Sequence, residues 1–175
     1  MVIFRYYNHN SKIINNKEFN ISKNISEEVI QQNKFEEKNY EVDITKKDIE
    51  TINWYIEIPA INLKAPIEET TNIEVLNNYV GHFEETSKTR GNIGLAGHNR
   101  GYKNNYFENL HKLKKGDEIK YQYFEFEKQY YVEKIEIIKN TNWSYLEKTD
   151  QNKITLITCV ENKPDLRLCI QAIQK

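Results

Sequence analysis

Glycine and proline, which mark most tight turns, are scarce in this sequence. It has 6 Gly and 3 Pro among 175 residues, and all of them lie after residue 58. We therefore expect two regions: a polar N-terminal segment, residues 1–50, and a folded domain, residues 51–175. The N-terminal segment is interpreted as a solvated spacer. Alternatively, Ser26–Lys38 forms a short polar helix that lies on the domain.

Cysteine is also rare, because the chain contains only Cys159 and Cys169. Two cysteines exclude a disulfide-rich scaffold, and they are too few for a zinc finger without histidines nearby. A metal site could in principle use His82, His98 and His111 together with Cys159. No pair among them has the C-x-x-C or H-x-x-x-H spacing that favours zinc, so we predict no metal centre.

The sequence also has few arginines and no long apolar run. Lys plus Arg total 25 and Asp plus Glu total 26, for a net charge of −1, and the few arginines are scattered. This balance argues against a nucleic-acid-binding protein, which would carry a basic patch. Apart from runs that include glycine, the longest apolar run is Met1–Phe4, far short of the ~20 residues of a membrane-spanning helix. We therefore expect neither a membrane span nor a secretory signal in the sequence as given.

Short apolar segments separated by turn residues dominate the rest of the chain, which is typical of an all-β domain. We predict a mostly β fold, a closed or near-closed barrel of about seven to eight strands with two or more short helices. One short helix should follow a cap at Thr71 or Asn72, and another should span 104–113, while 81–91 should be loop. A second strand, 61–67, should be interrupted at Pro66. The other strands are expected at 54–58, 92–97, 117–124, 129–138, 154–160 and 166–173.

Three residues could carry chemistry. Cys159 ends an apolar strand, where a thiol meets a loop and becomes accessible, although a free cysteine often only packs. His98 ends another strand lined by small residues, and a lone histidine is commonly structural. Arg167 follows on the return strand. It either pairs with a surface glutamate or offers a five-donor fork beside Cys159 for a developing oxyanion.

The remaining candidates have weaker contexts. Cys169 falls on the same strand face as Arg167 and is interpreted as a packing thiol. His9 lies in the polar N-terminal segment, His82 at the start of a loop, and His111 on a helix with polar neighbours.

Several motifs together resemble the sortase family. They are TLITC (155–159), DLR (165–167) and, about 60 residues upstream, AGHN (96–99). IEIPAINLKAPI (56–67) is similar to the paired entry strands of sortases, and GNIGLAGH (91–98) to the segment that leads into the family's histidine. NYFENLHKLKKGDEI (105–119) is similar to the short helix and Gly-Asp turn that follow. The resemblance covers residues 51–175.

The resemblance implies a cysteine transpeptidase of class D or class A type. It assigns Cys159 as the nucleophile, His98 as the general acid and base, and Arg167 as the oxyanion or substrate clamp. An enzyme of this type cleaves an LPxTG-like sorting signal between Thr and Gly and transfers the surface protein to an amine. Further candidate substrate-binding residues are Ala96, Gly97, Asn99, Thr158 and Trp143, and Tyr145 and Leu146 could line the same pocket.

The resemblance also implies partners and a location. The partners are C-terminal sorting signals and the amine of a cell-wall peptidoglycan precursor or of a pilin. The enzyme would act at the outer face of a Gram-positive membrane, held by an anchor that precedes Met1. No cofactor is required, although calcium is possible, with Glu68 and Glu69 as weak candidates. Two alternatives remain, a cysteine peptidase that only hydrolyses its acyl-enzyme and an idle β-barrel binding module.

Overall fold

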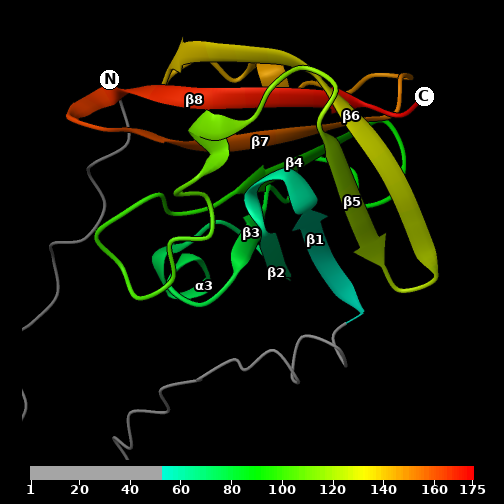
Figure 1. Ribbon diagram of the computed structural model, residues 1–175, viewed down its shortest axis with the longest axis horizontal. Coiled ribbons are helices and arrows are strands. Elements are labelled where there is room, and N and C mark those ends of the chain that lie inside the picture. Colours follow the sequence, from blue (N-terminus) through cyan, green and yellow to red (C-terminus); the bar gives the residue numbers. More distant parts are fainter. Residues whose placement is uncertain (1–52) are drawn as a thin grey trace, which may run out of the picture. The chain divides into compact units, whose positions relative to one another are not determined.

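The computed structural model describes residues 53–175, and these residues form a closed barrel of β-strands (Figure 1). The strand order around the barrel is β1-β2-β3-β4-β7-β8-β6-β5. This confirms the predicted mostly β, closed-barrel fold. The strands are β1 (Trp54–Ile58), β2 (Leu63–Glu69), β3 (Val80–His82), β4 (Asn92–Ala96), β5 (Glu118–Tyr123), β6 (Phe126–Lys139), β7 (Lys153–Val160) and β8 (Lys163–Ile173). The segment Ser26–Lys38 and the spacer interpretation of residues 1–50 lie outside the described residues.

Helical structure within residues 53–175 is limited to short turns. The one α-helix is α3 (Ile73–Leu76), which begins where predicted because the Asn72 side chain accepts a hydrogen bond from the Val75 N–H. Three 3₁₀ turns complete the set: η1 (Pro59–Ile61), η2 (Leu110–Lys112) and η3 (Ser144–Leu146).

The predicted helix at 104–113 is wrong, because that segment is a series of turns with only η2 in helical form. Its apolar residues still pack, since Phe107 and Leu110 are fully buried in the barrel core. The asparagine before them favours a turn: the Asn105 side chain bonds both the N–H and the carbonyl of Tyr102. The spacing of the apolar residues therefore correctly indicated that they are buried, but it wrongly indicated an α-helix.

Two details of the β2–β3 region also differ from expectation. β2 is not interrupted at Pro66, which lies opposite Tyr55, because pairing with β3 begins only at Ile67. On the β3 side, no backbone hydrogen bond is therefore required of Pro66, which has no N–H to donate. His82 does not start a loop: it belongs to β3 and is fully buried.

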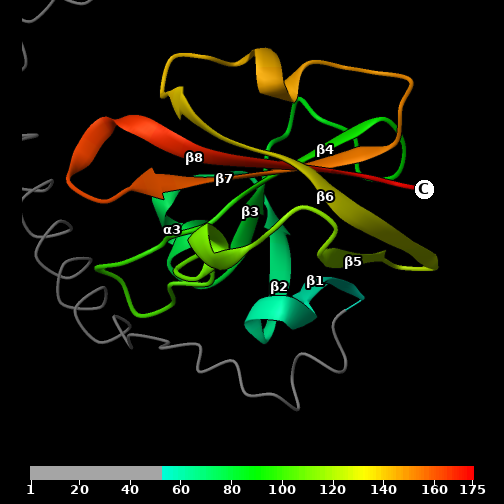
Figure 2. The same cartoon turned by 45° about the horizontal axis from the view of Figure 1, so that its top comes forward.

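Strand alternation gives the barrel wall two distinct faces at β7 and β8. Leu156 and Ile170 point into the main core. Ile157 and Cys169 point outward, where they form a second buried cluster with Ile138. The β6–β7 connection covers this cluster, and Figure 2 shows it arching over the side of the barrel opposite β1 and β2. Phe83, Tyr145 and Leu146 pack against it.

Candidate active site

Cys159 and Arg167 lie side by side on the outer face of the barrel wall. Cys159, a free and exposed cysteine, is near the end of β7. It is directly opposite Arg167 on β8 in the antiparallel register. Opposite residues in a sheet share a face, so the thiol and the guanidinium project to the same side.

His98 lies on the other side of Cys159 from Arg167, and we call the three residues together the row. β4 and β7 pair in parallel from Asn92↔Lys153 to Ala96↔Ile157, and this register continues past the end of β4. The Gly97 N–H donates to the Ile157 carbonyl (3.3 Å), and the Thr158 hydroxyl donates to the Gly97 carbonyl (2.7 Å). Continuing the register places His98 beside Cys159, so neighbouring strands bring His98, Cys159 and Arg167 together.

His98 is half-buried, and its surroundings favour the neutral imidazole. Burial lowers the pKa of His98 below its ordinary value of 6.5. Its Nε2 atom is buried and has no hydrogen-bond partner among residues 53–175. The ring of Tyr102 stacks on the imidazole, with the two ring centroids 3.5 Å apart and the planes tilted by 7°.

Arg167 is held by backbone carbonyls. Its Nη1 donates to the Pro164 carbonyl (2.7 Å) and to the Leu166 carbonyl (2.8 Å). Within the described part of the chain it has no carboxylate partner, so the alternative of a pair with a surface glutamate is not seen there. The Nη2 and Nε donors have no acceptor in that same part of the chain, which leaves them available to a ligand.

An ion pair joins the loops on either side of this row. Arg100 Nη1, in the connection after β4, lies 2.7 Å from Glu161 Oε1 in the β7–β8 turn. Figures 1 and 2 both show these two connections at the same end of the molecule. The side chain of Asn99 adds a second link, since its Nδ2 donates to the Cys159 carbonyl (2.6 Å).

The predicted substrate-binding residues occupy different environments. Thr158 and Gly97 are buried in the wall, and a Cβ on Gly97 would meet the Phe107 ring at 2.9 Å. The Asn99 amide is already bonded to the main chain, while Ala96 faces outward beside Ile157. Trp143 is 61% exposed at the start of the η3 turn and meets Phe83 edge to face. A substrate-binding role for these residues stays a prediction.

Tyr102 and the Arg100–Glu161 pair were missed by sequence reasoning. Tyr102 is four residues after His98 and follows Gly101, whose backbone is left-handed (φ +79°). The glycine was the available signal, because it allows the chain to fold back toward the histidine.

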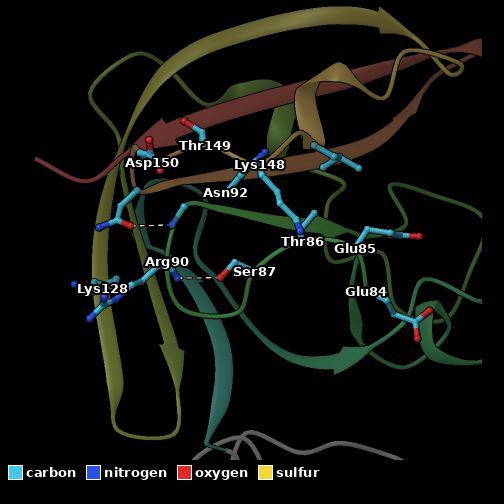
Figure 3. Close-up of a pocket in the computed structure, with 13 residues that line it drawn as sticks. Glu84, Glu85, Thr86, Ser87, Arg90, Asn92, Lys128, Lys148, Thr149 and Asp150 are labelled. Atoms are coloured by element: carbon cyan, nitrogen blue, oxygen red, sulfur yellow. Dashed lines mark hydrogen bonds between the residues drawn. The ribbon is translucent and has the colours of Figure 1, made fainter.

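A large pocket in the described structure lies away from Cys159. It has a volume of about 1050 Å³ and lies between the β3–β4 and β6–β7 connections (Figure 3). Its charged lining is mixed. Figure 3 shows the hydrogen bond from the Arg90 N–H to the Ser87 hydroxyl, and the Gly91 N–H donates to Asn152 Oδ1 (2.9 Å). The charged residues that line it are Glu84, Glu85, Asp150, Arg90, Lys128 and Lys148.

The two carboxylates suggested for calcium are already engaged. Glu69 is paired with Lys88, and its Oε1 lies 2.7 Å from His82 Nδ1. Glu68 Oε1 accepts the backbone N–H of Glu69 (2.9 Å). Among residues 53–175, no group of three or more His, Cys, Asp or Glu side chains is arranged to hold a metal ion. Calcium binding by Glu68 and Glu69 stays a prediction.

Comparisons with known proteins are consistent with the fold and the motifs. Residues 56–174 match the family model for the sortase domain. The chain is 32% identical to Sortase A of Bacillus anthracis over 118 residues, which cover 67% of this chain and 56% of that protein. It is 29% identical to Sortase D of Bacillus subtilis (strain 168) over 107 residues, 59% of this chain and 52% of that protein. The match thus spans just over half the length of these relatives.

Solved structures show the same architecture. A Clostridium perfringens Sortase D5 transpeptidase is 31% identical, with a TM-score of 0.64, and the match covers 78% of this chain and 90% of that one. A lid mutant of Sortase A from Corynebacterium diphtheriae is 25% identical, with a TM-score of 0.66, covering 71% of this chain and 70% of that one. Proteins named Sortase A, Sortase C and Sortase D are all among the similar proteins, so the class stays a prediction. No helix within residues 53–175 is long and apolar enough to cross a membrane.

Proposed function

The chain belongs to the sortase family, and on that premise we propose that it is a cysteine transpeptidase. It cleaves an LPxTG-like sorting signal between Thr and Gly and joins the Thr carbonyl to an amine. The observation that carries the proposal is the row formed by His98, Cys159 and Arg167 on neighbouring strands of the outer barrel face. This arrangement offers a base, a nucleophile and an anion donor to one bound carbonyl.

Acylation uses the exposed thiol and the neutral imidazole. Because burial lowers the pKa of His98, its free ring nitrogen can take the proton of the Cys159 thiol near neutral pH. The thiolate attacks the Thr carbonyl carbon, forming a C–S bond. Collapse of the tetrahedral intermediate breaks the Thr–Gly C–N bond, and the imidazolium of His98 returns its proton to the leaving glycine amine.

Transfer reverses these proton movements. The acceptor amine attacks the thioester carbonyl, a new C–N bond forms and the C–S bond breaks. His98 takes the proton that the amine loses and returns it to the Cys159 thiolate, so the enzyme is restored. Arg167 faces the oxyanion in both halves, because its Nη2 and Nε donors are free on the same side of the sheet as the thiol.

The partners follow from this chemistry. The donor is the C-terminal sorting signal of a surface protein, and the acceptor is an amine of a peptidoglycan precursor or of a pilin. The enzyme works at the outer face of the cell membrane, where both substrates are available. As proposed, neither half-reaction requires a metal or an organic cofactor.

Intact-mass spectrometry with a panel of LPxTG-like peptides tests the proposal. We expect a mass gain equal to the peptide's N-terminal part, and its release as a ligated product when an amine is added. The Cys159→Ala variant should show no adduct. Cys169→Ala is the matched control and should retain the adduct, because burial raises the pKa of Cys169 to about 12 and keeps that thiol protonated. An adduct released only by water would indicate a hydrolysing peptidase. An adduct that persists in Cys159→Ala would contradict the assignment.

The role of Arg167 has a separate test. Arg167→Ala removes the donors that face the oxyanion and should lower kcat/KM about 100-fold, since one oxyanion donor is worth about 3 kcal/mol. Arg167→Lys keeps the charge without the fork and should recover only part of the loss. Steady-state kinetics of peptide ligation measures both variants. Activity of Arg167→Ala within a few-fold of the unmodified enzyme would exclude the role.

A further inference from the structure

Within the described structure, no hydrogen bond at Nε2 fixes the ring plane of His98. That atom is buried and has no partner within residues 53–175. In many enzymes a carboxylate or amide holds the second nitrogen of a catalytic histidine and so fixes the ring. At this position the structure offers a different contact, the parallel stack of the Tyr102 ring at 3.5 Å.

The loop that carries Tyr102 is built to hold this ring over the imidazole. The Asn105 side chain accepts from the Tyr102 N–H (3.2 Å), and its amide donates to the Tyr102 carbonyl (2.8 Å). The Phe107 N–H donates to the His98 carbonyl (2.9 Å), which closes the loop at its base. Phe107 itself is buried beneath Gly97, so the base of the loop is anchored in the core.

The tyrosine gains little from burial, which argues that packing alone does not explain its position. Tyr102 is 45% exposed, and its hydroxyl makes no hydrogen bond in the part of the chain that the structure describes. A half-exposed aromatic ring, clamped at its backbone and parallel to a histidine, is suited to hold that histidine in one orientation.

We propose that Tyr102 is a positioning residue for His98: its ring fixes the plane of the imidazole and so keeps a ring nitrogen directed at the Cys159 thiol. This inference rests on the proposed function, because it concerns proton transfer between His98 and Cys159. The aromatic face, and not the hydroxyl, is the part that acts. Tyr102→Phe should therefore preserve the effect and Tyr102→Ala should remove it.

The first measurement is the kinetics of peptide ligation by the full chain. Tyr102→Ala should lower kcat about 10-fold while KM changes less than about two-fold, because misorientation of a catalytic group affects the chemical step more than binding. Tyr102→Phe should stay within about two-fold of the unmodified enzyme in kcat. Lys103→Ala, an exposed neighbour on the same loop, is the matched control and should change neither constant. Thermal unfolding confirms that all three variants fold.

A second measurement separates this inference from the proposed function. The rate of Cys159 alkylation by iodoacetamide needs no sorting signal and reports on proton removal from the thiol. We expect Tyr102→Ala to react several-fold more slowly than Tyr102→Phe at pH 7. If the unmodified chain ligates no peptide but the two variants show this alkylation difference, the transpeptidase proposal fails while the positioning role stands. Equal rates in the two variants would overturn the positioning role, and faster ligation or alkylation by Tyr102→Ala would identify Tyr102 as a cover over the site.

Discussion

At the scale of single residues, the protonation state of His98 governs the proposed chemistry. Burial disfavours the charged imidazolium and lowers the pKa of His98 below 6.5. As the pH falls through that lowered value, the ring becomes protonated and can no longer accept the thiol proton. We therefore predict that kcat/KM for peptide ligation declines on the acid side with a midpoint below pH 6.5. A pH series of ligation rates measures this limb.

The exposed His111 provides the control for this profile. His111 lies on η2, in a different element from the row, and its Nδ1 is 2.9 Å from the Glu108 carbonyl. The profile of His111→Gln should superimpose on that of the unmodified enzyme. An acid-side midpoint above pH 7 would show that a group other than a desolvated histidine limits the rate.

Local sequence marked His98, Cys159 and Arg167 as candidates, and the resemblance to sortases assigned their roles, whereas the residues that support them were not predicted. Cys159 and His98 each end an apolar strand, and Arg167 is a charged residue in a strand of apolar neighbours, so each stands out by its context. Tyr102 had a weaker signal: Gly101 before it permits a left-handed turn, but an aromatic residue in a polar segment is equally consistent with ordinary surface exposure. Its importance depends on a loop that folds back, which pattern analysis along the chain does not show.

At the scale of elements, a buried polar network attaches the β6–β7 connection to the barrel wall. Asn92, which is buried, donates through Nδ2 to the carbonyls of Tyr145 (2.8 Å) and Glu147 (3.1 Å). The Thr155 hydroxyl donates to Asn92 Oδ1 (2.8 Å), and Gln171 Nε2 donates to the Tyr145 carbonyl (3.2 Å). These bonds hold the covering connection against the outer face that carries Cys159.

Asn92→Ala should loosen this connection without altering the reacting groups. Loss of a buried hydrogen-bonded amide leaves carbonyl groups unsatisfied and should lower the free energy of unfolding by about 1–3 kcal/mol. Because the connection packs on Ile157, two residues before Cys159 on the same face of β7, we also predict a rise of several-fold in KM for the sorting-signal peptide with a smaller change in kcat. Denaturant unfolding and ligation kinetics measure the two effects.

Asn142→Ala is the matched control, since this asparagine is exposed on the same connection and its side chain bonds only Ser144 within the described structure. It should change stability by less than about 0.5 kcal/mol. A KM for Asn92→Ala equal to that of Asn142→Ala would mean that the connection does not contribute to peptide binding.

The elements themselves show which sequence signals are reliable. The hairpins β5–β6 and β7–β8 were predicted closely, because strand alternation and turn residues act together in these segments. The helix at 104–113 failed, since four apolar residues at helical spacing also suit a chain of turns that lies on a barrel core. The network at Asn92 was not predictable, because its partners are backbone carbonyls about 50 residues away.

At the scale of the whole molecule, barrel closure depends on a short seam between β2 and β3. These strands pair in parallel over only three positions, ending at Glu69↔His82. A charged cluster reinforces this end: Glu69 contacts His82 and Lys88, and the Lys88 ammonium lies over the Trp54 ring at 5.3 Å. The cluster therefore joins β1, β2, β3 and the β3–β4 connection.

The charge of Glu69 makes this part of the stability dependent on pH. Burial alone would raise the pKa of Glu69, but hydrogen bonds from Lys88 and His82 outweigh it, and the net pKa is lowered below 4.5. A carboxylate whose folded-state pKa is lowered stabilises the fold above its unfolded-state pKa. That contribution disappears as the pH falls through the folded-state value. The barrel should thus lose stability in acid from about pH 4.5 downward.

Glu69→Gln tests whether this seam matters for the stability of the whole barrel. Because the Glu69 side chain is about a third exposed, solvent reduces the effect, and we expect a loss of about 1 kcal/mol at pH 7. The difference from the unmodified protein should shrink toward zero below the folded-state pKa, where Glu69 is itself neutral. Denaturant unfolding at several pH values, followed by Trp fluorescence, measures it, since Trp54 lies 5.5 Å from the His82 ring. Glu68→Gln, on the same strand and without an ion pair in the described residues, should show no such pH dependence. If the loss of unfolding free energy in Glu69→Gln stays constant from pH 7 to pH 3, packing, and not charge, stabilises the pairing of β2 with β3.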